Sequence, residues 1–213
     1  MRSLVWSAAA MLLLAAPSLA DDAWTERTLR GSWATGSQRV HIDMPPAKIT
    51  IETATDGKLS AEIEVTCDSW RRNCRETAGK LALESGPEGD AFRLGIAGMP
   101  HGNIRGLSLR GRILVPRGVA VEVDLGVGEL KIRDVEGPLD VDVGVGEVKI
   151  HSPQRAVHSV SLGVGVGEGS LEVGGRDVEA KGWLGRSVEW GGGSGRSRMN
   201  VRVGVGEAHI SID

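Results

Sequence analysis

One short phrase recurs four times in the second half of the chain and constrains the fold more than any other feature. Each copy is an apolar residue followed by Gly-Val-Gly-Glu, and the successive glutamates lie 18, 21 and 39 residues apart. The last gap is about two of the preceding periods, which is typical of a repeated supersecondary unit. The copies end at Glu129, Glu147, Glu168 and Glu207.

Apolar and polar residues alternate on both sides of each Gly-Glu pair, but the apolar positions change parity across it. Around the first pair the apolar residues are Val121, Val123, Leu125 and Val127, then Leu130 and Ile132. Successive side chains of a strand point to opposite faces, so the chain must turn a corner at Gly-Glu to keep its apolar side inward. We therefore expect strand–corner–strand units, with Val127 and its equivalents facing the interior.

The doubled last gap predicts one more, degenerate unit between the third and fourth copies. Its corner falls at Leu184-Gly185-Arg186, where Arg186 replaces the glutamate. The repeat region is thus expected to contain about five units of 18–21 residues.

Two folds satisfy this pattern. In a β-solenoid each unit is one coil and neighbouring coils stack, whereas in an antiparallel β-meander or sandwich each Gly-Glu pair is a two-residue hairpin turn. The near-constant period favours the solenoid, because hairpins need not hold one length.

The chain upstream of the repeats also alternates. The expected strands cover residues 40–44, 49–53, 59–67, 81–85, 92–96 and 107–115. Residues 21–36 are polar and unpatterned, which indicates an arm or capping segment. No segment of ten or more residues beyond the first twenty has a helical period, so we expect an all-β protein.

The first twenty residues are typical of a secretory signal peptide. Arg2 precedes a short apolar run that ends in small residues, and we expect cleavage after Ala20 and a periplasmic or secreted protein. The apolar run is too short to span a bilayer, and Asp21 stands where a lipid anchor needs cysteine. The expected organisation is a signal at 1–20, an N-terminal β region at 21–117 and a Gly-rich repeat region at 118–213, with 37–213 forming one continuous domain.

Cys67 and Cys74 are the two cysteines of the chain. In an oxidising compartment, two cysteines this close predict a disulfide-closed loop. The spacing is not that of a Cys-x-x-Cys redox motif, and no histidine or second cysteine pair lies nearby to complete a metal site.

The segment from Leu114 to Val123, followed by repeats ending in Gly-Glu-x-x-Ile, resembles the bacterial putative-adhesin family of unknown function. The resemblance covers residues 49–213, most strongly 111–150 and 199–213. It implies a right-handed β-solenoid or toast-rack-like stack in an exported or envelope protein, and it implies no activity. This chain differs from many members in having Gly-Val-Gly-Glu in place of Ser-Gly-Asp, and in its cysteine pair.

Stacking would bring the corner residues into a column that forms a candidate binding edge. The expected order is Glu129, Glu147 and Glu168, then Arg186 and Glu207. Like charges at strand spacing repel, so the side chains must fan apart in solvent, accept backbone N–H bonds or share a cation such as calcium. The glycine column at 126, 144, 165 and 204 indicates either a tight corner or a flat face for a glycan or partner.

Other candidate sites are weaker. Trp70, Trp183 and Trp190 are candidates for stacking on a glycan or partner, although such residues more often cap a core. The five histidines have no metal-ligand spacing, so we expect no metal site, no catalytic residue and no cofactor.

Composition narrows the function. A net charge of −3 provides no basic field for nucleic acid. We expect a non-enzymatic envelope-associated module for binding, adhesion or scaffolding, whose partner is an envelope protein or a surface polysaccharide. The alternative is a polysaccharide-cleaving β-helix enzyme, which would require a groove lined by Asp, Arg and Lys. Exposed strand edges also allow self-association.

Overall fold

The computed structural model describes residues 23–68, 72–100, 105–178 and 185–213, and it confirms an all-β protein. Within these ranges, thirteen strands pair in one sheet that does not close, accompanied by one short α-helix and one 3-10 turn. The strands are β1 (Ala23–Trp33), β2 (Arg39–Met44), β3 (Ala47–Thr53), β4 (Leu59–Asp68), β5 (Ala82–Glu88), β6 (Ala91–Ala97), β7 (Leu107–Val115), β8 (Ala120–Arg133), β9 (Leu139–Ser152), β10 (Val157–Val173), β11 (Arg176–Val178), β12 (Arg186–Gly191) and β13 (Ser197–Ile212).

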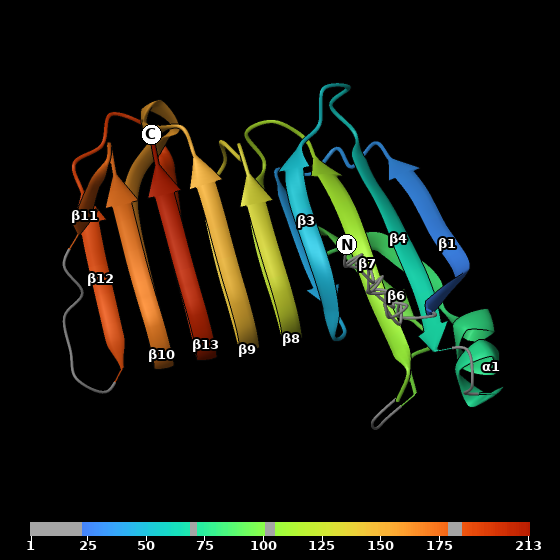
Figure 1. Ribbon diagram of the computed structural model, residues 1–213. Helices are drawn as coiled ribbons and strands as arrows, with labels where there is room; N and C mark the ends of the chain where they lie inside the picture. Colours follow the sequence, from blue (N-terminus) through green and yellow to red (C-terminus); the bar gives the residue numbers. More distant parts are fainter. Residues whose placement is uncertain (1–22, 69–71, 101–104, 179–184) are drawn as a thin grey trace, which may run out of the picture.

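Four long, bent strands divide the sheet into two facing layers. The C-terminal halves of β8, β9, β13 and β10 join β1, β4, β7, β3 and β11 in the layer that lies in front in Figure 1. Their N-terminal halves join β5, β6, β2 and β12 in the layer behind. We call these the front layer and the back layer. Such a pair of layers is compatible with a sandwich.

Burial along the bent strands follows the change of parity that the sequence predicts. In β8, Val121, Val123 and Leu125 are buried before the corner, and Leu130 and Ile132 are buried after it. Apolar side chains of both halves therefore meet between the layers. The Gly-Glu pairs lie inside continuous strands, so none of them forms a two-residue hairpin turn.

The repeat strands pair in parallel and in register, so equivalent residues of neighbouring copies lie side by side. Val123 pairs with Val141 and Glu129 with Glu147. The order in the sheet is β8, β9, β13, β10, because the fourth copy inserts between the second and the third. The sequence order does not predict this arrangement.

The degenerate unit expected around Arg186 does not form a bent parallel copy in the described residues. β11 runs antiparallel to the C-terminal half of β10, and β12 runs antiparallel to its N-terminal half. Arg186 pairs with Val164, close to the corner. β12 begins at Arg186, so the described residues show no bend at the expected corner, and two antiparallel strands stand in place of the expected unit.

The N-terminal region extends both layers. The segment expected to be an arm is strand β1, which pairs antiparallel with β4 at the sheet edge and buries Leu29. Helix α1 (Arg72–Lys80) follows β4, and its Cys74 and Ala78, one turn apart, are both buried. The predicted disulfide between Cys67 and Cys74 is present and joins β4 to the helix.

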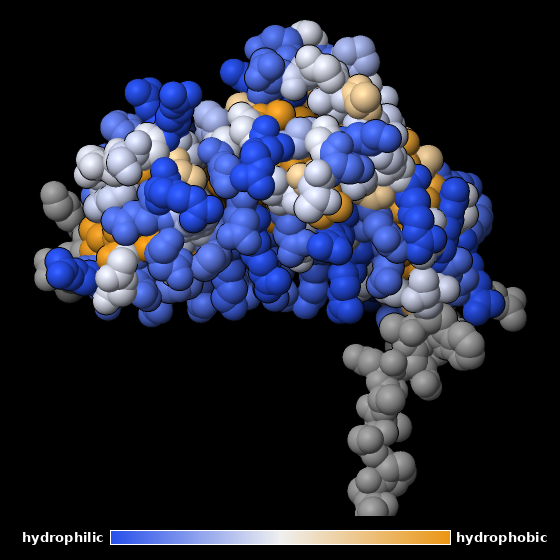
Figure 2. Space-filling model, turned by 90° about the horizontal axis from the view of Figure 1, so that it is seen from above, coloured by the Kyte–Doolittle hydropathy of each residue, from blue (hydrophilic) through white to orange (hydrophobic). Residues whose placement is uncertain are grey.

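Hydrophilic side chains cover most of the face that Figure 2 shows, and hydrophobic ones are visible mainly between the two layers. None of the helices within the described ranges has the length and hydropathy of a membrane span. The signal peptide expected at residues 1–20 lies outside the described residues.

Candidate functional site

The glutamates of the four repeats form a straight row on the outer face of the front layer. We call Glu129, Glu147, Glu207 and Glu168, in this spatial order, the glutamate row. Sequence reasoning predicted the column but placed Glu207 at its end, and the register corrects that order. Arg186 pairs with Val164 instead of with a glutamate of the row.

Lysines offset the charge of the first two members of the row. Lys48 of β3 donates a hydrogen bond of 2.6 Å to Glu129, and Lys149 forms an ion pair with Glu147. The hydrogen bond from Lys48 lowers the pKa of the Glu129 carboxyl, and the one to Glu147 raises the pKa of the Lys149 ammonium. The row is therefore stabilised in part by neighbouring cations.

The valines of the repeated phrase form a ridge at the apex of the corner. Val127, Val145, Val205 and Val166 lie in register and are 47, 47, 46 and 58% exposed. We call them the valine ridge. The sequence expectation that they face the interior was wrong, because the corner carries them beyond the end of the core. The apolar residues on either side of Val127, which are Leu125 two positions before it and Leu130 three positions after it, are buried.

The corner glycines are required by backbone contacts. A Cβ atom on Gly146 or Gly206 would lie 1.8 Å from a carbonyl oxygen of the neighbouring strand, and both have φ of at least +140°. A Cβ atom on Gly144 would lie 2.6 Å from the Gly126 carbonyl oxygen. In the glycine column at 126, 144, 165 and 204, the tight corner expected from the sequence agrees with the contacts at Gly144, Gly165 and Gly204, whereas a Cβ atom on Gly126 would have no atom within 4 Å.

The tryptophan candidates do not form a common surface in the described residues. Trp70 and Trp183 lie outside the described residues. Trp190 is partly buried, packs against the core and lies beside Gly193. Its ring is thus used at least in part for packing.

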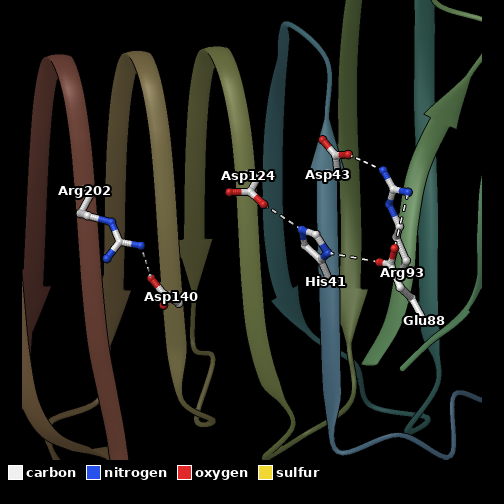
Figure 3. A network of polar contacts seen from close by, with 7 residues as sticks. All are labelled: His41, Asp43, Glu88, Arg93, Asp124, Asp140 and Arg202. Atoms are coloured by element: carbon white, nitrogen blue, oxygen red, sulfur yellow. Dashed lines mark hydrogen bonds and ion pairs between the residues drawn. The ribbon is translucent and has the colours of Figure 1, made fainter. Parts of the chain in front are cut away.

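A network of charged side chains covers the outer face of the back layer (Figure 3). His41 of β2 is bonded through Nε2 to Asp124 Oδ2 of β8, at 2.8 Å. On the other side of the ring, Nδ1 lies 3.7 Å from a Glu88 carboxylate oxygen. Arg93 donates to Asp43 at 2.6 Å, and Arg202 of β13 lies 3.2 Å from Asp140 of β9.

His41, Glu122 and Asp124 also meet a geometric condition for holding an ion. One ligand atom from each lies within 4.8 Å of the other two. Sequence reasoning missed this group, because His41 and Glu122 are 81 residues apart and become neighbours only through the pairing of β2 with β8. The one indication in the sequence was the alternation of apolar and polar residues, which predicts that His41 and Glu122 each lie on the outer face of their strand.

The back layer also has a shallow hollow of about 290 Å³ beside this group. Arg39, Glu122, Asp140, Arg198 and Asn200 contribute its charged and amide side chains. The hollow is small, and Asp140 is the one charged side chain of its lining that forms an ion pair among the described residues, with Arg202.

Ser170 and His209 are the one serine–histidine pair with a hydrogen bond among the described residues, at 2.7 Å. Both side chains are exposed on the outer face of the front layer. A nucleophile and a base need a third group that orients the histidine and donors for the oxyanion, in a site that excludes water. An open strand face does not exclude water.

No family model and no curated protein matches the chain. Among solved structures, it is similar to a putative cell adhesion protein from Clostridium sporogenes, with 13% identity over 88% of this chain and all of the other, at a TM-score of 0.49. It is also similar to a putative adhesin from Bacteroides fragilis, with 11% identity over 86 and 97% of the two chains, at a TM-score of 0.31. A putative lipid binding protein from Parabacteroides distasonis is 8% identical over 87% of this chain and 96% of the other, at a TM-score of 0.21.

The adhesin descriptions agree with the resemblance drawn from the sequence.

Proposed function

We propose that the protein is an exported, non-enzymatic module that binds another envelope protein through its corner edge, formed by the valine ridge and the glutamate row. Its repeat strands act as a solenoid-like stack that presents one chemical pattern four times. The observation that carries the proposal is the alignment of four half-exposed valines beside four glutamates.

The valine ridge contributes little to the fold of the chain itself. Side chains that are about half exposed have buried only part of their apolar surface, and contiguous exposed apolar surface often marks an interaction site.

The energy available from the ridge indicates what else a partner must provide. Covering the exposed part of each valine would contribute roughly 1 kcal/mol, or about 4 kcal/mol for the ridge. That corresponds to a dissociation constant of only about 1 mM, before the cost of association. Affinity and specificity must therefore also come from the charges of the glutamate row.

Glu207 and Glu168 are exposed members of the row. A partner segment with Lys or Arg next to aliphatic residues would complement both features. An aliphatic ridge without an aromatic platform is less suited to a sugar, which favours a protein over the polysaccharide option.

The test is binding by immobilised protein to two analytes: an envelope protein fraction and a purified surface polysaccharide from the same source. We expect saturable binding of the protein fraction, which is lost when the four ridge valines are replaced by Ser. The double variant Glu207→Gln and Glu168→Gln should weaken binding, and its matched control is Glu84→Gln with Glu189→Gln on the back layer.

Equal binding by the ridge variant and the wild-type protein would refute the proposal. Release of new reducing ends from the polysaccharide would point instead to the enzyme alternative. Export is tested separately by the intact mass of the secreted protein, which we expect to begin at Asp21.

A further inference from the structure

The back layer carries a second site, independent of the corner edge, around His41. This ring is only 23% exposed and lies between carboxylates from two directions, Asp124 at 2.8 Å and Glu88 at 3.7 Å. Glu122 pairs directly with His41 in the β2–β8 register and completes the group of three ligand atoms within 4.8 Å.

The distances between the ligand atoms of His41, Glu122 and Asp124 can be compared with those between the ligands of a bound metal ion. Zinc binds histidine nitrogen and carboxylate oxygen at about 2.0–2.2 Å, which places the ligand atoms of a tetrahedral ion roughly 3–3.5 Å apart. The ligand atoms of the group, which lie 2.8 Å (His41 and Asp124) to at most 4.8 Å apart, would need to move by about 1 Å to reach that spacing.

The backbone that presents the ligands is well supported. β2 and β8 pair in register over six residues, and the side chains on the inner face beneath the group are fully buried, among them Ile42, Val121 and Val123. Glu122 and Asp124 are two residues apart on one strand and so project from the same face. A rigid sheet fixes the spacing of the three ligands before any ion binds.

Glu88 lies where an outer-shell partner is expected. A histidine that binds a metal through one nitrogen usually donates its other N–H to a carboxylate, which fixes the tautomer. Here Nε2 faces Asp124 and Nδ1 faces Glu88. Arg93 donates a hydrogen bond of 2.6 Å to Asp43 and lies 3.9 Å from Glu88, so a positive charge is close to the outer carboxylate.

The surrounding charges leave the group acidic. Asp140 and Asp142 of β9, directly opposite Glu122 and Asp124, are paired with Arg202. Arg93 pairs with Asp43, whereas Arg39 and Arg198 line the hollow next to Glu122 and form no ion pair with it among the described residues. Among the described residues, no Lys or Arg forms an ion pair with Glu122 or Asp124, and His41 is the bonded neighbour of Asp124.

We propose that His41, Glu122 and Asp124 bind one divalent transition-metal ion, with Glu88 as the outer-shell partner of the histidine. A nitrogen ligand together with two carboxylates suits Zn²⁺ better than Ca²⁺ or Mg²⁺, which prefer all-oxygen sites. Three protein ligands leave a fourth position open to water.

The test is calorimetric titration of the purified, untagged protein with Zn²⁺. We expect one ion per chain. His41→Gln should weaken binding roughly 100-fold or more, because even outer-shell partners contribute about 10–100-fold. Glu88→Gln should weaken it about 10-fold. His209→Gln, the same change on the exposed front layer, is the matched control and should leave the affinity unchanged.

Two further measurements complete the design. Circular dichroism confirms that each variant is folded, and if His41→Gln does not fold, the double variant Glu122→Gln and Asp124→Asn replaces it with the same expected loss. Bound Co²⁺ should show visible absorption that His41→Gln abolishes.

The proposal is refuted if Zn²⁺ up to about 1 mM, a range weaker than any structural zinc site, gives no saturable binding. It is also refuted if His41→Gln and His209→Gln bind equally, since this would indicate adsorption to surface carboxylates. Equally tight Ca²⁺ binding that survives His41→Gln would replace it with an all-oxygen site.

Discussion

The corner glycines allow a sharp test of the fold, and Gly206→Ala is the most informative change. Gly206 has φ +140°, and a Cβ atom on it would lie 1.8 Å from the carbonyl oxygen of Gly146 on the neighbouring strand. Gly126→Ala is the matched control, because it changes a glycine of the same corner whose Cβ would have no atom within 4 Å.

Two effects add to the cost of Gly206→Ala. The backbone conformation is one that glycine alone adopts freely, which costs another residue about 1–3 kcal/mol. Real Cβ contacts stay above 3.0 Å, so the Gly146 carbonyl must move away, and one or two ladder hydrogen bonds at about 0.5–1.5 kcal/mol each are lost with it. The expected loss in free energy of unfolding is roughly 2–5 kcal/mol.

Denaturant unfolding followed by circular dichroism measures this loss, and thermal melting should show a decrease of about 4–20 °C for a domain of this size. Gly126→Ala should change the free energy of unfolding by less than about 0.5 kcal/mol or increase it slightly. A Gly206→Ala variant as stable as wild type, or an equal loss in both variants, would refute the close approach of strands at the corner.

Three other changes test separate features. Val203→Ala should lower the free energy of unfolding by about 1–3 kcal/mol, because this side chain is buried. Val205→Ala, two residues further at the exposed apex, should lower it by less than about 0.5 kcal/mol. Equal losses in denaturant unfolding would contradict the exposed position of Val205. Reduction of the disulfide, which closes a separation of seven residues, should lower stability by about 2–3 kcal/mol, and an unchanged denaturation midpoint would argue against it. The pKa of Glu129 is below its usual value, so the contribution of this carboxyl to stability is present above the pKa of an ordinary glutamate and is lost as pH falls through the lowered value. Lys48→Met should raise that pKa in an NMR titration of the carboxyl carbon, and an unchanged value would show that Lys48 is not the cause.

Local pattern was sufficient to predict most strands. The expected strand at residues 107–115 coincides with β7, and the alternation before and after each Gly-Glu pair gave the corner position correctly. These features depend on side chains that alternate within one segment. The polar N-terminal segment gave no such signal, because β1 is an edge strand for which Leu29 is the clear buried residue.

The order of the strands and the group around His41 could not be predicted, because they depend on which distant segments become neighbours in the sheet. A period gives the length of a unit but not its place in the sheet, so the position of Glu207 between Glu147 and Glu168 was unforeseen. The parity rule assumes that side chains alternate regularly through Val127, although β8 bends there and leaves this side chain exposed at the apex. The group around His41 requires two strands separated by 81 positions, a distance at which no spacing motif operates.

The position of β13 has a consequence for the order of folding. It is the last described strand, yet both of its edges are occupied, and its contacts with β9 join residues 60 positions apart. Until these 16 residues arrive, β9 and β10 have no partner to connect them, and two long apolar strand edges stay open to wrong pairing. Such non-local closure makes folding slow. The interior between the layers is therefore complete only when β13 has inserted, and a chain shortened before Ser197 would leave β9 and β10 without their common partner.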